Sequence, residues 1–292
     1  MTAAKTPKVI LITGCSSGFG LLMAARFSSC GHFVFATMRH LEKKQALLDE
    51  VSKRGGNLQV LQLDVNNAES VRSAVRQVID QTGRIDVLIN NAGFALGGFF
   101  EDLAEEEIRA QMETNFFGAQ AVTREVLPFM RSQKKGWIIN ISSVSGLYTA
   151  PALGAYSASK WALEGFSEGL YYEVKPFGIH VCLVEPGTYP TEIFGRNKKY
   201  GKNFNNPLSP YLSRSKFLDQ RVADYVSHVK KDPKTVVRLV ESLMNSVHPP
   251  LRSVPDTESR IIVGLRKILP LSVFTLLFER ILFWGYRKES KT

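Results

Sequence analysis

The stretch KVILITGCSSGFG, residues 8–20, joins a short apolar run to a loop that contains three glycines. The run VILI is apolar and rich in β-branched residues, which is typical of a buried strand. Gly14, Gly18 and Gly20 follow it, and the residues beyond them keep a helical pattern to about residue 30. A strand, a tight glycine turn and a helix in this order indicate the first unit of an α/β fold.

The same alternation of short apolar runs and longer helical patterns continues along the chain. It predicts strands at 8–13, 32–37, 57–65, 85–90, 136–143, 178–186 and 259–264. It predicts helices over 41–54, 67–82 and 104–132, and around Tyr156. Strands that alternate with helices form right-handed units in a mostly parallel sheet. We therefore expect an α/β fold with a Rossmann-type, doubly wound parallel sheet in three layers.

Length and composition agree with one domain and a helical extension. The chain has 292 residues, of which 44% are hydrophobic and 22% are charged, as in ordinary globular proteins. We expect a catalytic domain over residues 1–264, which includes a substrate loop at 188–230. A hydrophobic helical tail is expected over residues 265–292.

The cysteines and the N-terminus favour a cytoplasmic protein. Cys15, Cys30 and Cys182 form no CxxC pair, which argues for a reducing compartment without structural disulfides or a metal site. The N-terminus lacks the long apolar core of a signal peptide.

The formal net charge is +10, and much of the basic excess lies in residues 193–238. A basic surface can serve nucleic acid, an anionic membrane or an anionic ligand. No zinc finger or RNA-binding aromatic motif accompanies it. We therefore expect no nucleic-acid partner and favour a solvated loop and helix face.

Small or polar residues lie at the carboxyl ends of four of the expected strands. They are Gly14, Asn90, Ser143 and Pro186. Ligands of an open α/β sheet bind outside the carboxyl ends of its strands. The glycine spacing G-x-x-x-G-x-G differs from the common G-x-G-x-x-G, but glycines still let the backbone approach a pyrophosphate at a helix N-terminus. Ser16 and Ser17 can add hydroxyl donors or cap that helix.

The end of the second expected strand, ATMRHLEK, bears on the choice of nucleotide. An acidic residue there would hold the ribose 2′-hydroxyl of NAD, and an arginine favours the 2′-phosphate of NADP. Met38 stands where the acid would be and Arg39 follows it. The planar guanidinium suits a phosphate, so we expect NADP(H) rather than NAD(H). The alternative is that Arg39 faces solvent.

Four motifs in order resemble the short-chain dehydrogenase/reductase family from about residue 8 to 264. They are TGCSSGFG (13–20), NNAG (90–93), the SS of NISSVSG (142–143) and YSASK (156–160), with LDV (63–65) and EPG (185–187) in support. The glycine motif, ATMR and HPPLRSVP (248–255) are most similar to the hydroxysteroid- and retinol-dehydrogenase-like branch.

The resemblance implies a role for each matching residue. Tyr156 would be the catalytic acid/base, and Lys160 would lower its pKa and hold the nicotinamide ribose. Ser143 would bind the substrate oxygen, as would Tyr156, and Asn115 would hold a water in a proton relay. The implied cofactor contacts are Gly14, Ser16, Ser17, Gly18, Phe19, Gly20, Arg39, Asp64, Val65, Asn91, Ala92, Gly93, Tyr156, Lys160, Pro186, Gly187 and Thr191.

Elementary chemistry supports these roles independently. A free tyrosine has a pKa of about 10, too high for a base at neutral pH. A nearby ammonium and an oxidised nicotinamide both favour the phenolate. The four-residue spacing puts Lys160 on the helix face of Tyr156. The alternatives are an ordinary helix-face pair, a local turn at Ser143 and a backbone-bonding Asn115.

One segment departs from the family pattern. PGTYPTE has Tyr189 and Pro190 where the family more often has a small aliphatic residue and a non-proline. Because Pro190 lacks a backbone N–H, a cofactor contact there is in doubt.

Apolar residues around the expected site favour a hydrophobic alcohol or ketone of steroid, retinoid or fatty-chain type. A long irregular loop is usually a functional lid. The pocket candidates are Phe94, Leu96, Phe99, Leu147, Tyr148, Leu153, Phe194, Phe204, Tyr211, Leu212 and Phe217. The alternative for about half of them is core packing.

The tail has an apolar run, Ile268–Phe278, of 11 residues, which is shorter than the roughly 20 residues needed to span a bilayer. One interpretation is an interfacial helix that makes peripheral membrane contact. Its apolar side would carry Phe274, Leu277, Phe278, Ile281 and Trp284. The alternatives are a helix over the substrate mouth or one buried in a dimer.

These observations predict an NADP(H)-dependent oxidoreductase that interconverts a hydrophobic secondary alcohol and its ketone or aldehyde. A homodimer through 104–132 and the helix of Tyr156 is expected from the resemblance. Two other functions stay open. One is a non-catalytic NADP(H)-binding sensor or scaffold, and the other is a membrane-associated lipid-pathway ketoreductase.

Overall fold

The computed structural model describes residues 6–193 and 198–286. Its centre is a seven-stranded parallel sheet in the order β3-β2-β1-β4-β6-β7-β9. The strands are β1 (Val9–Ile12), β2 (Phe33–Met38), β3 (Gln59–Gln62), β4 (Val87–Asn90), β6 (Gly136–Ile141), β7 (Ile179–Val184) and β9 (Arg252–Ser253). The strand order reverses between β1 and β4, so the predicted doubly wound sheet is confirmed.

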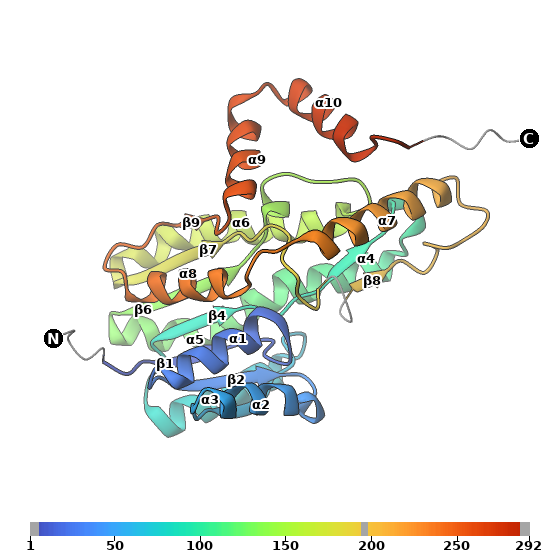
Figure 1. Cartoon of the computed structure of the whole chain (residues 1–292). Coiled ribbons are helices and arrows are strands. Elements are labelled where there is room, and N and C mark those ends of the chain that lie inside the picture. Colours follow the sequence, from blue (N-terminus) through green and yellow to red (C-terminus); the bar gives the residue numbers. More distant parts are fainter. Residues whose placement is uncertain (1–5, 194–197, 287–292) are drawn as a thin grey trace, which may run out of the picture.

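Helices cover both faces of this sheet (Figure 1). The helices are α1 (Gly18–Ser29), α2 (Gln45–Lys53), α3 (Ala68–Thr82), α4 (Glu105–Met112), α5 (Gly118–Gln133), α6 (Gly154–Val174), α7 (Leu212–His228), α8 (Lys234–Asn245), α9 (Thr257–Ile268) and α10 (Leu271–Leu282). Short helical turns are η1 (Leu41–Lys43), η2 (Phe100–Asp102), η3 (Glu113–Phe117), η4 (Val144–Gly146) and η5 (Lys175–Phe177). A small two-stranded sheet pairs β5 (Ala95–Gly97) with β8 (Lys198–Tyr200).

Alternate residues of β1 enter two separate cores. Ile10 and Ile12 pack with α1, α2 and α8 on one face of the sheet. Val9 and Leu11 pack with α3, α5 and α6 on the other face. Because both faces are covered, every residue of β1 is apolar and buried, and each fully buried side chain stabilises the fold by roughly 1.5–3 kcal/mol. The three layers predicted from the sequence are therefore present.

The predicted strand at 259–264 is wrong, because these residues belong to α9. Asp256 caps this helix by accepting a hydrogen bond from the Ser259 N–H at 3.0 Å. The apolar residues follow a helical spacing, in which Val263 is buried and Ile261 is exposed. The seventh strand is β9, which precedes α9 and pairs Arg252 with Leu183 of β7. Residue 264, the expected end of the catalytic domain, therefore falls inside a helix.

The single helix expected over 104–132 is interrupted. A π-helical turn, η3, separates α4 from α5 and contains the buried Asn115. Such a turn inserts one extra residue into a helix and often occurs at functional sites.

The long segment at 188–230 contains β8 and α7 after an irregular start. Within the described parts of the chain, no helix has both the length and the apolar character needed to cross a bilayer.

Candidate active site

The glycine-rich loop after β1 needs glycine for two reasons. Gly14 and Gly18 adopt positive φ values of 72° and 58°, which other residues rarely adopt. A Cβ on Gly14 would lie 2.7 Å from the Ala92 Cα, and one on Gly20 would collide with the Gly14 carbonyl oxygen. The loop leads directly into α1, whose first turn has no acidic residue. This close-packed loop at a positive helix end fits a dinucleotide pyrophosphate.

The ends of β1 and β4 are joined by hydrogen bonds. The Thr13 hydroxyl accepts from the Asn91 N–H at 2.9 Å and from the Ala92 N–H at 3.0 Å. The Asn91 side chain donates to the Thr13 and Gly14 carbonyls at 2.9 and 3.0 Å. Thr13 was not predicted as a site residue. Its position at the end of the first expected strand, with a hydroxyl group, could have indicated that it contacts the neighbouring strand end. These bonds hold the NNAG segment against the glycine loop.

Arg39 and Asp64 follow neighbouring strands at the same edge of the sheet, since β2 and β3 are paired up to Met38 and Gln62. Arg39 is exposed, and its Nε donates to His40 Nε2 at 2.9 Å. The Asp64 carboxylate accepts from the Asn66 N–H at 3.0 Å. Val65 is buried against Gly118 at the start of α5. The predicted ribose and adenine contacts therefore lie on adjacent strand ends.

Tyr156, Lys160 and Ser143 meet at the carboxyl edge of β6. Tyr156 and Lys160 project from α6 and are 7% and 6% exposed. The Tyr156 side chain is hydrogen-bonded to Ser143. Lys160 Nζ donates to the Ile141 carbonyl at 2.9 Å and lies 5.8 Å from the centre of the Tyr156 ring. The four-residue spacing thus places the Lys160 ammonium near the Tyr156 ring at the end of β6.

Ser143 also makes the local turn considered as its alternative role. Its Oγ accepts from the Ser145 N–H at 3.1 Å and donates to the Pro186 carbonyl at 3.4 Å. These contacts fix the hydroxyl between β6, η4 and the segment after β7. A serine held in this way is oriented by the backbone as well as by Tyr156.

Burial shifts the pKa values of the tyrosine and the lysine in opposite directions. Desolvation raises the pKa of Tyr156 to about 12, and the hydrogen bond with Ser143 opposes this shift. Desolvation lowers the pKa of Lys160 to about 8, and the charge of Glu164 opposes this shift. Each shift disfavours the charged form of a buried group. The expected lowering of the Tyr156 pKa by Lys160 stays a prediction.

Asn115 connects the loop after NNAG to α6. Its Nδ2 donates to the Phe94 carbonyl at 3.0 Å and to Ser159 Oγ at 3.1 Å. Its Oδ1 accepts from the Phe94 N–H at 3.1 Å. The Asn115 side chain therefore forms hydrogen bonds with the backbone, which is the alternative role considered from the sequence. It also contacts α6. Ser159, between Tyr156 and Lys160, was not singled out from the sequence.

The segment after β7 lies over the glycine loop. Thr191 is 3.9 Å from the position that a Cβ on Gly18 would occupy. The Gly187 N–H donates to Asp256 Oδ2 at 3.3 Å. Tyr189 is buried in the core and packs edge-on against Phe19, with ring centres 5.6 Å apart. The unusual tyrosine thus fills the core beside α1.

A buried acidic pair lies beyond Lys160, on α6 and just after β7. Glu164 and Glu185 are 3% and 1% exposed, and the charge of Glu164 acts on Glu185. Arg252 of β9 pairs with Glu164, with Glu185 at 3.5 Å and with Glu168 at 2.7 Å. Burial raises the pKa of both buried carboxyls, to about 8 for Glu185. Burial thus favours the protonated form of Glu185 at neutral pH.

The expected pocket residues form several aromatic groups. Phe99 stacks on Tyr211 at 4.8 Å, Tyr200 contacts Phe204 at 4.2 Å, and Phe217 contacts Tyr286 at 5.3 Å between ring centres. Leu96 is buried in β5. Phe194 lies outside the described residues. The groups are thus divided between the β5–β8 region and the C-terminal helices.

Tyr148, eight residues before Tyr156, contacts the tail. Its ring centre is 6.2 Å from that of Phe274 and 5.4 Å from that of Phe278, both on α10. This agrees with one alternative from the sequence, a tail helix that packs close to the expected substrate mouth.

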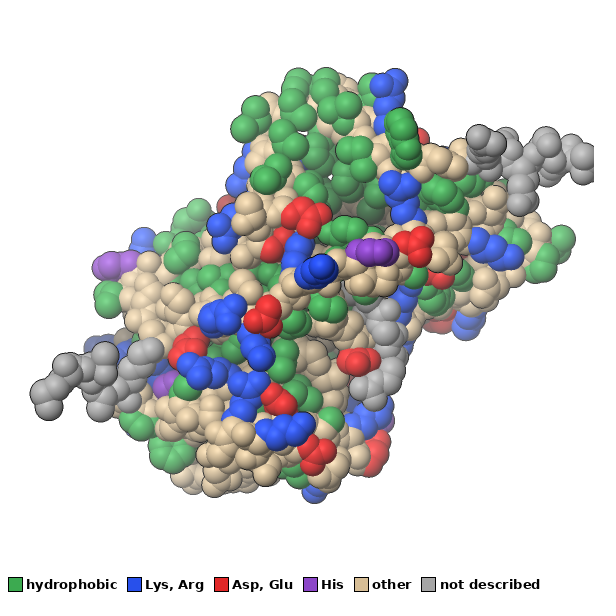
Figure 2. Space-filling model, viewed as in Figure 1, with side chains coloured by type: hydrophobic (Ala, Val, Ile, Leu, Met, Phe, Trp, Pro, Cys, Tyr) green, Lys and Arg blue, Asp and Glu red, His purple; other side chains and the backbone are tan. Residues whose placement is uncertain are grey.

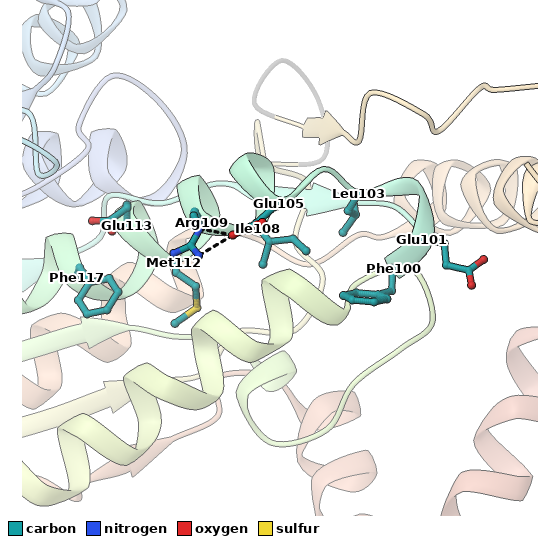
Figure 3. A pocket seen from close by; sticks show the side chains of 9 residues that line it. All are labelled: Phe100, Glu101, Leu103, Glu105, Ile108, Arg109, Met112, Glu113 and Phe117. Carbon is teal, nitrogen blue, oxygen red and sulfur yellow. Dashed lines mark hydrogen bonds and ion pairs between the residues drawn. The ribbon is translucent and has the colours of Figure 1, made fainter.

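A surface hollow of about 640 Å³ lies along η2, α4 and η3 (Figure 3). Phe100, Ile108 and Met112 point to the same side of this segment, and Arg109 pairs with Glu105 at 2.6 Å. None of the residues that line the hollow is a predicted site residue. The hollow is thus distinct from the glycine loop and Tyr156.

Comparisons with known proteins cover most of the chain. The family model for short chain dehydrogenase matches residues 8–200. The chain is 47% identical over 211 residues to a 3-ketodihydrosphingosine reductase of Bacteroides thetaiotaomicron, covering 69% of this chain and 75% of that protein. It is 35% identical over 274 residues to retinol dehydrogenase 8 of Bos taurus, covering 91% and 87%. A short-chain dehydrogenase structure from Streptomyces avermitilis matches with a TM-score of 0.79 at 32% identity, covering 97% of this chain and 100% of that one.

Proposed function

Because this chain belongs to the short-chain dehydrogenase family, we propose that it is an NADP(H)-dependent oxidoreductase that interconverts a hydrophobic alcohol and its carbonyl compound. The family assignment confirms the resemblance that the sequence motifs predicted. The observation that carries the proposal is the placement of the Tyr156 phenol near Ser143, which favours its ionised form, with Lys160 one helical turn further along α6 and 5.8 Å from the Tyr156 ring centre. The glycine loop at the same sheet edge suits a bound dinucleotide.

Each of the three side chains has a separate task in the proposed reaction. The nicotinamide, when bound, supplies or accepts the hydride. Ser143 holds the substrate oxygen with its hydroxyl. Tyr156 gives that oxygen a proton during reduction and removes one during oxidation. Lys160 supplies a positive charge that favours the phenolate form of Tyr156.

The protonation state of Tyr156 supports carbonyl reduction. Burial raises the pKa of this phenol to about 12, so it carries its proton at neutral pH. A protonated phenol is the form needed to act as a general acid towards a carbonyl oxygen. Oxidation would instead require the phenolate, which the charge of Lys160 favours.

Arg39 supports NADP(H) as the cofactor. It is exposed directly after β2, where a nucleotide 2′-phosphate would lie in this fold. Met38 at the end of β2 is buried and carries no carboxylate to hold a 2′-hydroxyl. A guanidinium at this position favours the additional phosphate.

The substrate class is proposed from the apolar residues near Tyr156 and from the relatives. Tyr148 contacts two aromatic rings of α10, and Leu147 and Leu153 are partly buried in the same segment. One relative is named for 3-ketodihydrosphingosine and another for retinol. A long apolar ketone or alcohol is therefore the proposed substrate.

A second candidate is a membrane-associated lipid-pathway ketoreductase. The 47% identity to a 3-ketodihydrosphingosine reductase favours this narrower function. The exposed apolar residues of α9 and α10 also favour it.

The proposal is tested by nucleotide absorbance during turnover. NADPH and NADH would be offered with steroid, retinoid, fatty-chain and small aromatic carbonyls, for the wild type and for Tyr156→Phe. We expect NADPH oxidation with a long apolar carbonyl and a loss of about 10²-fold or more in the variant, since proton transfer contributes about that factor. The control is NADPH affinity measured by fluorescence, which Tyr156→Phe should leave within a few-fold.

Other outcomes would point elsewhere. Equal turnover by both proteins would show that Tyr156 is only a helix-face residue. NADPH binding without turnover of any carbonyl would favour the non-catalytic sensor or scaffold.

A further inference from the structure

The outward faces of α9 and α10 expose a continuous series of large apolar side chains. On α9 the exposed residues are Ile261, Leu265 and Ile268, and on α10 and just after it they are Leu271, Val273, Leu276, Leu277, Ile281 and Trp284. Ile268 is 81% exposed and Trp284 is 77% exposed. Apolar side chains gather over these two helices in Figure 2. We call this set the tail face.

The tail face belongs to helices that are held in place from the inside. Phe274 of α10 is buried, and its ring stacks on that of Phe278 at 5.5 Å. Both rings contact Tyr148. At the end of α10, the Arg221 guanidinium donates to the Ile281 and Trp284 carbonyls at 2.8 and 2.7 Å. The outward apolar surface is thus a formed face with a fixed orientation.

The charged residues beside the tail face indicate which kind of partner it binds. Within α9 and α10 the cations are Arg260, Arg266, Lys267 and Arg280, and the acids are Glu258 and Glu279. Glu258 is already paired with Lys231 at 2.8 Å. The sequence that follows, RKESKT, adds three basic residues and one acid, and the whole chain carries +10. Pairing of two tail faces would bring these cations together and is disfavoured, whereas an anionic surface would be attracted.

We propose that the tail face docks on an anionic lipid bilayer, with α9 and α10 lying on the membrane surface. Apolar side chains of such helices enter the boundary between headgroups and acyl chains, and a tryptophan is favoured at that level. Lys267 lies at the edge of the tail face and Arg280 lies within it. The long side chains of both residues can reach anionic headgroups.

Docking would also orient the expected substrate mouth. The inner side of α10 contacts Tyr148, which precedes Tyr156 by eight residues. Membrane binding would therefore place this region next to the bilayer, where an apolar substrate is concentrated. This last step rests on the proposed function, but the docking itself does not.

The test is co-sedimentation of the full chain with phosphatidylcholine vesicles that contain or lack phosphatidylserine. We expect binding to the phosphatidylserine vesicles, and a loss of about tenfold or more in apparent lipid affinity for the double variant Ile268→Glu, Leu276→Glu. Val247→Glu is the matched control, because Val247 is 74% exposed outside the tail face. Thermal melts would check that all proteins are folded.

Electrostatic attraction to the lipid headgroups and insertion of the tail face into the bilayer are measured separately. Lys267→Glu with Arg280→Glu should weaken binding to phosphatidylserine vesicles by about tenfold, with little effect on any binding to phosphatidylcholine alone. Brominated lipids should quench the fluorescence of Trp284, and Trp284→Phe should remove this quenching, because Trp137 is buried and Trp161 lies on α6.

Wild-type protein that does not sediment with phosphatidylserine vesicles would overturn the proposal. So would equal binding by the Ile268→Glu, Leu276→Glu variant. Light scattering without lipid shows whether a second copy covers the tail face. If the wild type self-associates and does not bind vesicles, and this variant abolishes the self-association, the tail face is covered by a second copy and not by a membrane. Vesicle binding without carbonyl turnover would sustain the docking and leave only the proposed enzyme in error.

Discussion

At the scale of single residues, burial controls the charges around Lys160. Lys160 is 6% exposed and its ammonium donates to the Ile141 carbonyl, while burial favours the protonated form of Glu185 beyond it. An unshared charge at any of these positions would carry a large desolvation cost. The hydrogen bond from Lys160 to the Ile141 carbonyl and that from Arg252 to Glu164 reduce this cost.

The raised pKa of Glu185 predicts a pH dependence of stability. Burial, followed by the charge of Glu164, raises the pKa of Glu185 from 4.5 to about 8. The folded protein then binds more protons than the unfolded chain between these values, so stability is full below pH 4.5 and is lost as the pH rises through about 8. One such proton changes the free energy of unfolding by up to about 1.4 kcal/mol per pH unit.

Glu185→Gln should flatten this dependence, because the amide keeps the shape of the protonated carboxyl and does not titrate. Urea unfolding between pH 5 and pH 8.5 measures the slope for both proteins. Glu168→Gln is the control, since Glu168 also pairs with Arg252 but is 48% exposed. Identical slopes for wild type and Glu185→Gln would refute the prediction.

Arg39 carries a prediction about cofactor choice. Arg39→Ala should raise the KM for NADPH about 10- to 100-fold and change that for NADH only a few-fold, because the lost interaction is with the 2′-phosphate. Steady-state kinetics with both nucleotides measure the ratio. Lys43→Ala in the nearby exposed η1 is the control. A parallel loss with both nucleotides would mean that Arg39 does not select the phosphate.

At the scale of elements, the cap of α9 connects the tail to the site. Asp256 accepts from the Ser259 N–H, pairs with Lys231 at 2.7 Å and accepts from the Gly187 N–H at 3.3 Å. One side chain thus holds the start of α9, the segment before α8 and the turn after β7. This convergence explains why residues that read as an apolar strand in isolation form a helix.

Asp256→Ala should lower the free energy of unfolding by about 2 kcal/mol, since a helix cap and a partly buried ion pair are lost together. Chemical denaturation gives the value. Thr257→Ala, at an exposed position in the first turn of α9, should change stability by less than about 0.5 kcal/mol. Equal effects of the two variants would show that the Asp256 contacts contribute little.

At the scale of the whole molecule, the surface offers two separate candidate interfaces. The tail face lies over α9 and α10, whereas other exposed aromatic side chains lie on η2, η3 and α6. Phe100 is 79% exposed and lines the hollow on α4, and Trp161 on α6 is 48% exposed. We propose that a homodimer forms through α4, α5 and α6, separately from the membrane surface.

Sedimentation velocity should therefore give a mass of about twice the 32.6 kDa of one chain. Trp161→Asp should shift the protein towards the monomer, because a charge at the centre of an interface is left without a partner. Phe33→Asp is the matched control, since Phe33 is 59% exposed at the start of β2. A wild-type protein that sediments as a monomer would contradict the dimer.

Local patterns were enough to predict six of the seven strands of the sheet, most of the helices between them and several residues at its carboxyl edge. The β-branched run at 9–12, the glycines at 14, 18 and 20 and the four-residue spacing of Tyr156 and Lys160 are all short-range signals. They carry this information because strand and helix periodicities and glycine turns depend on neighbouring residues. The parallel order of the sheet then brings the strand ends together.

The tertiary structure decided features that join distant parts of the chain. The residues at 259–264 became a helix because Asp256 caps it, although a short apolar run fits a strand equally well by pattern. Arg252 reaches Glu164 across 88 positions, and Tyr148 meets Phe278 of the tail. Such contacts leave no local periodicity in the sequence. Only packing of the complete chain determines which buried charges are paired and which apolar face stays open.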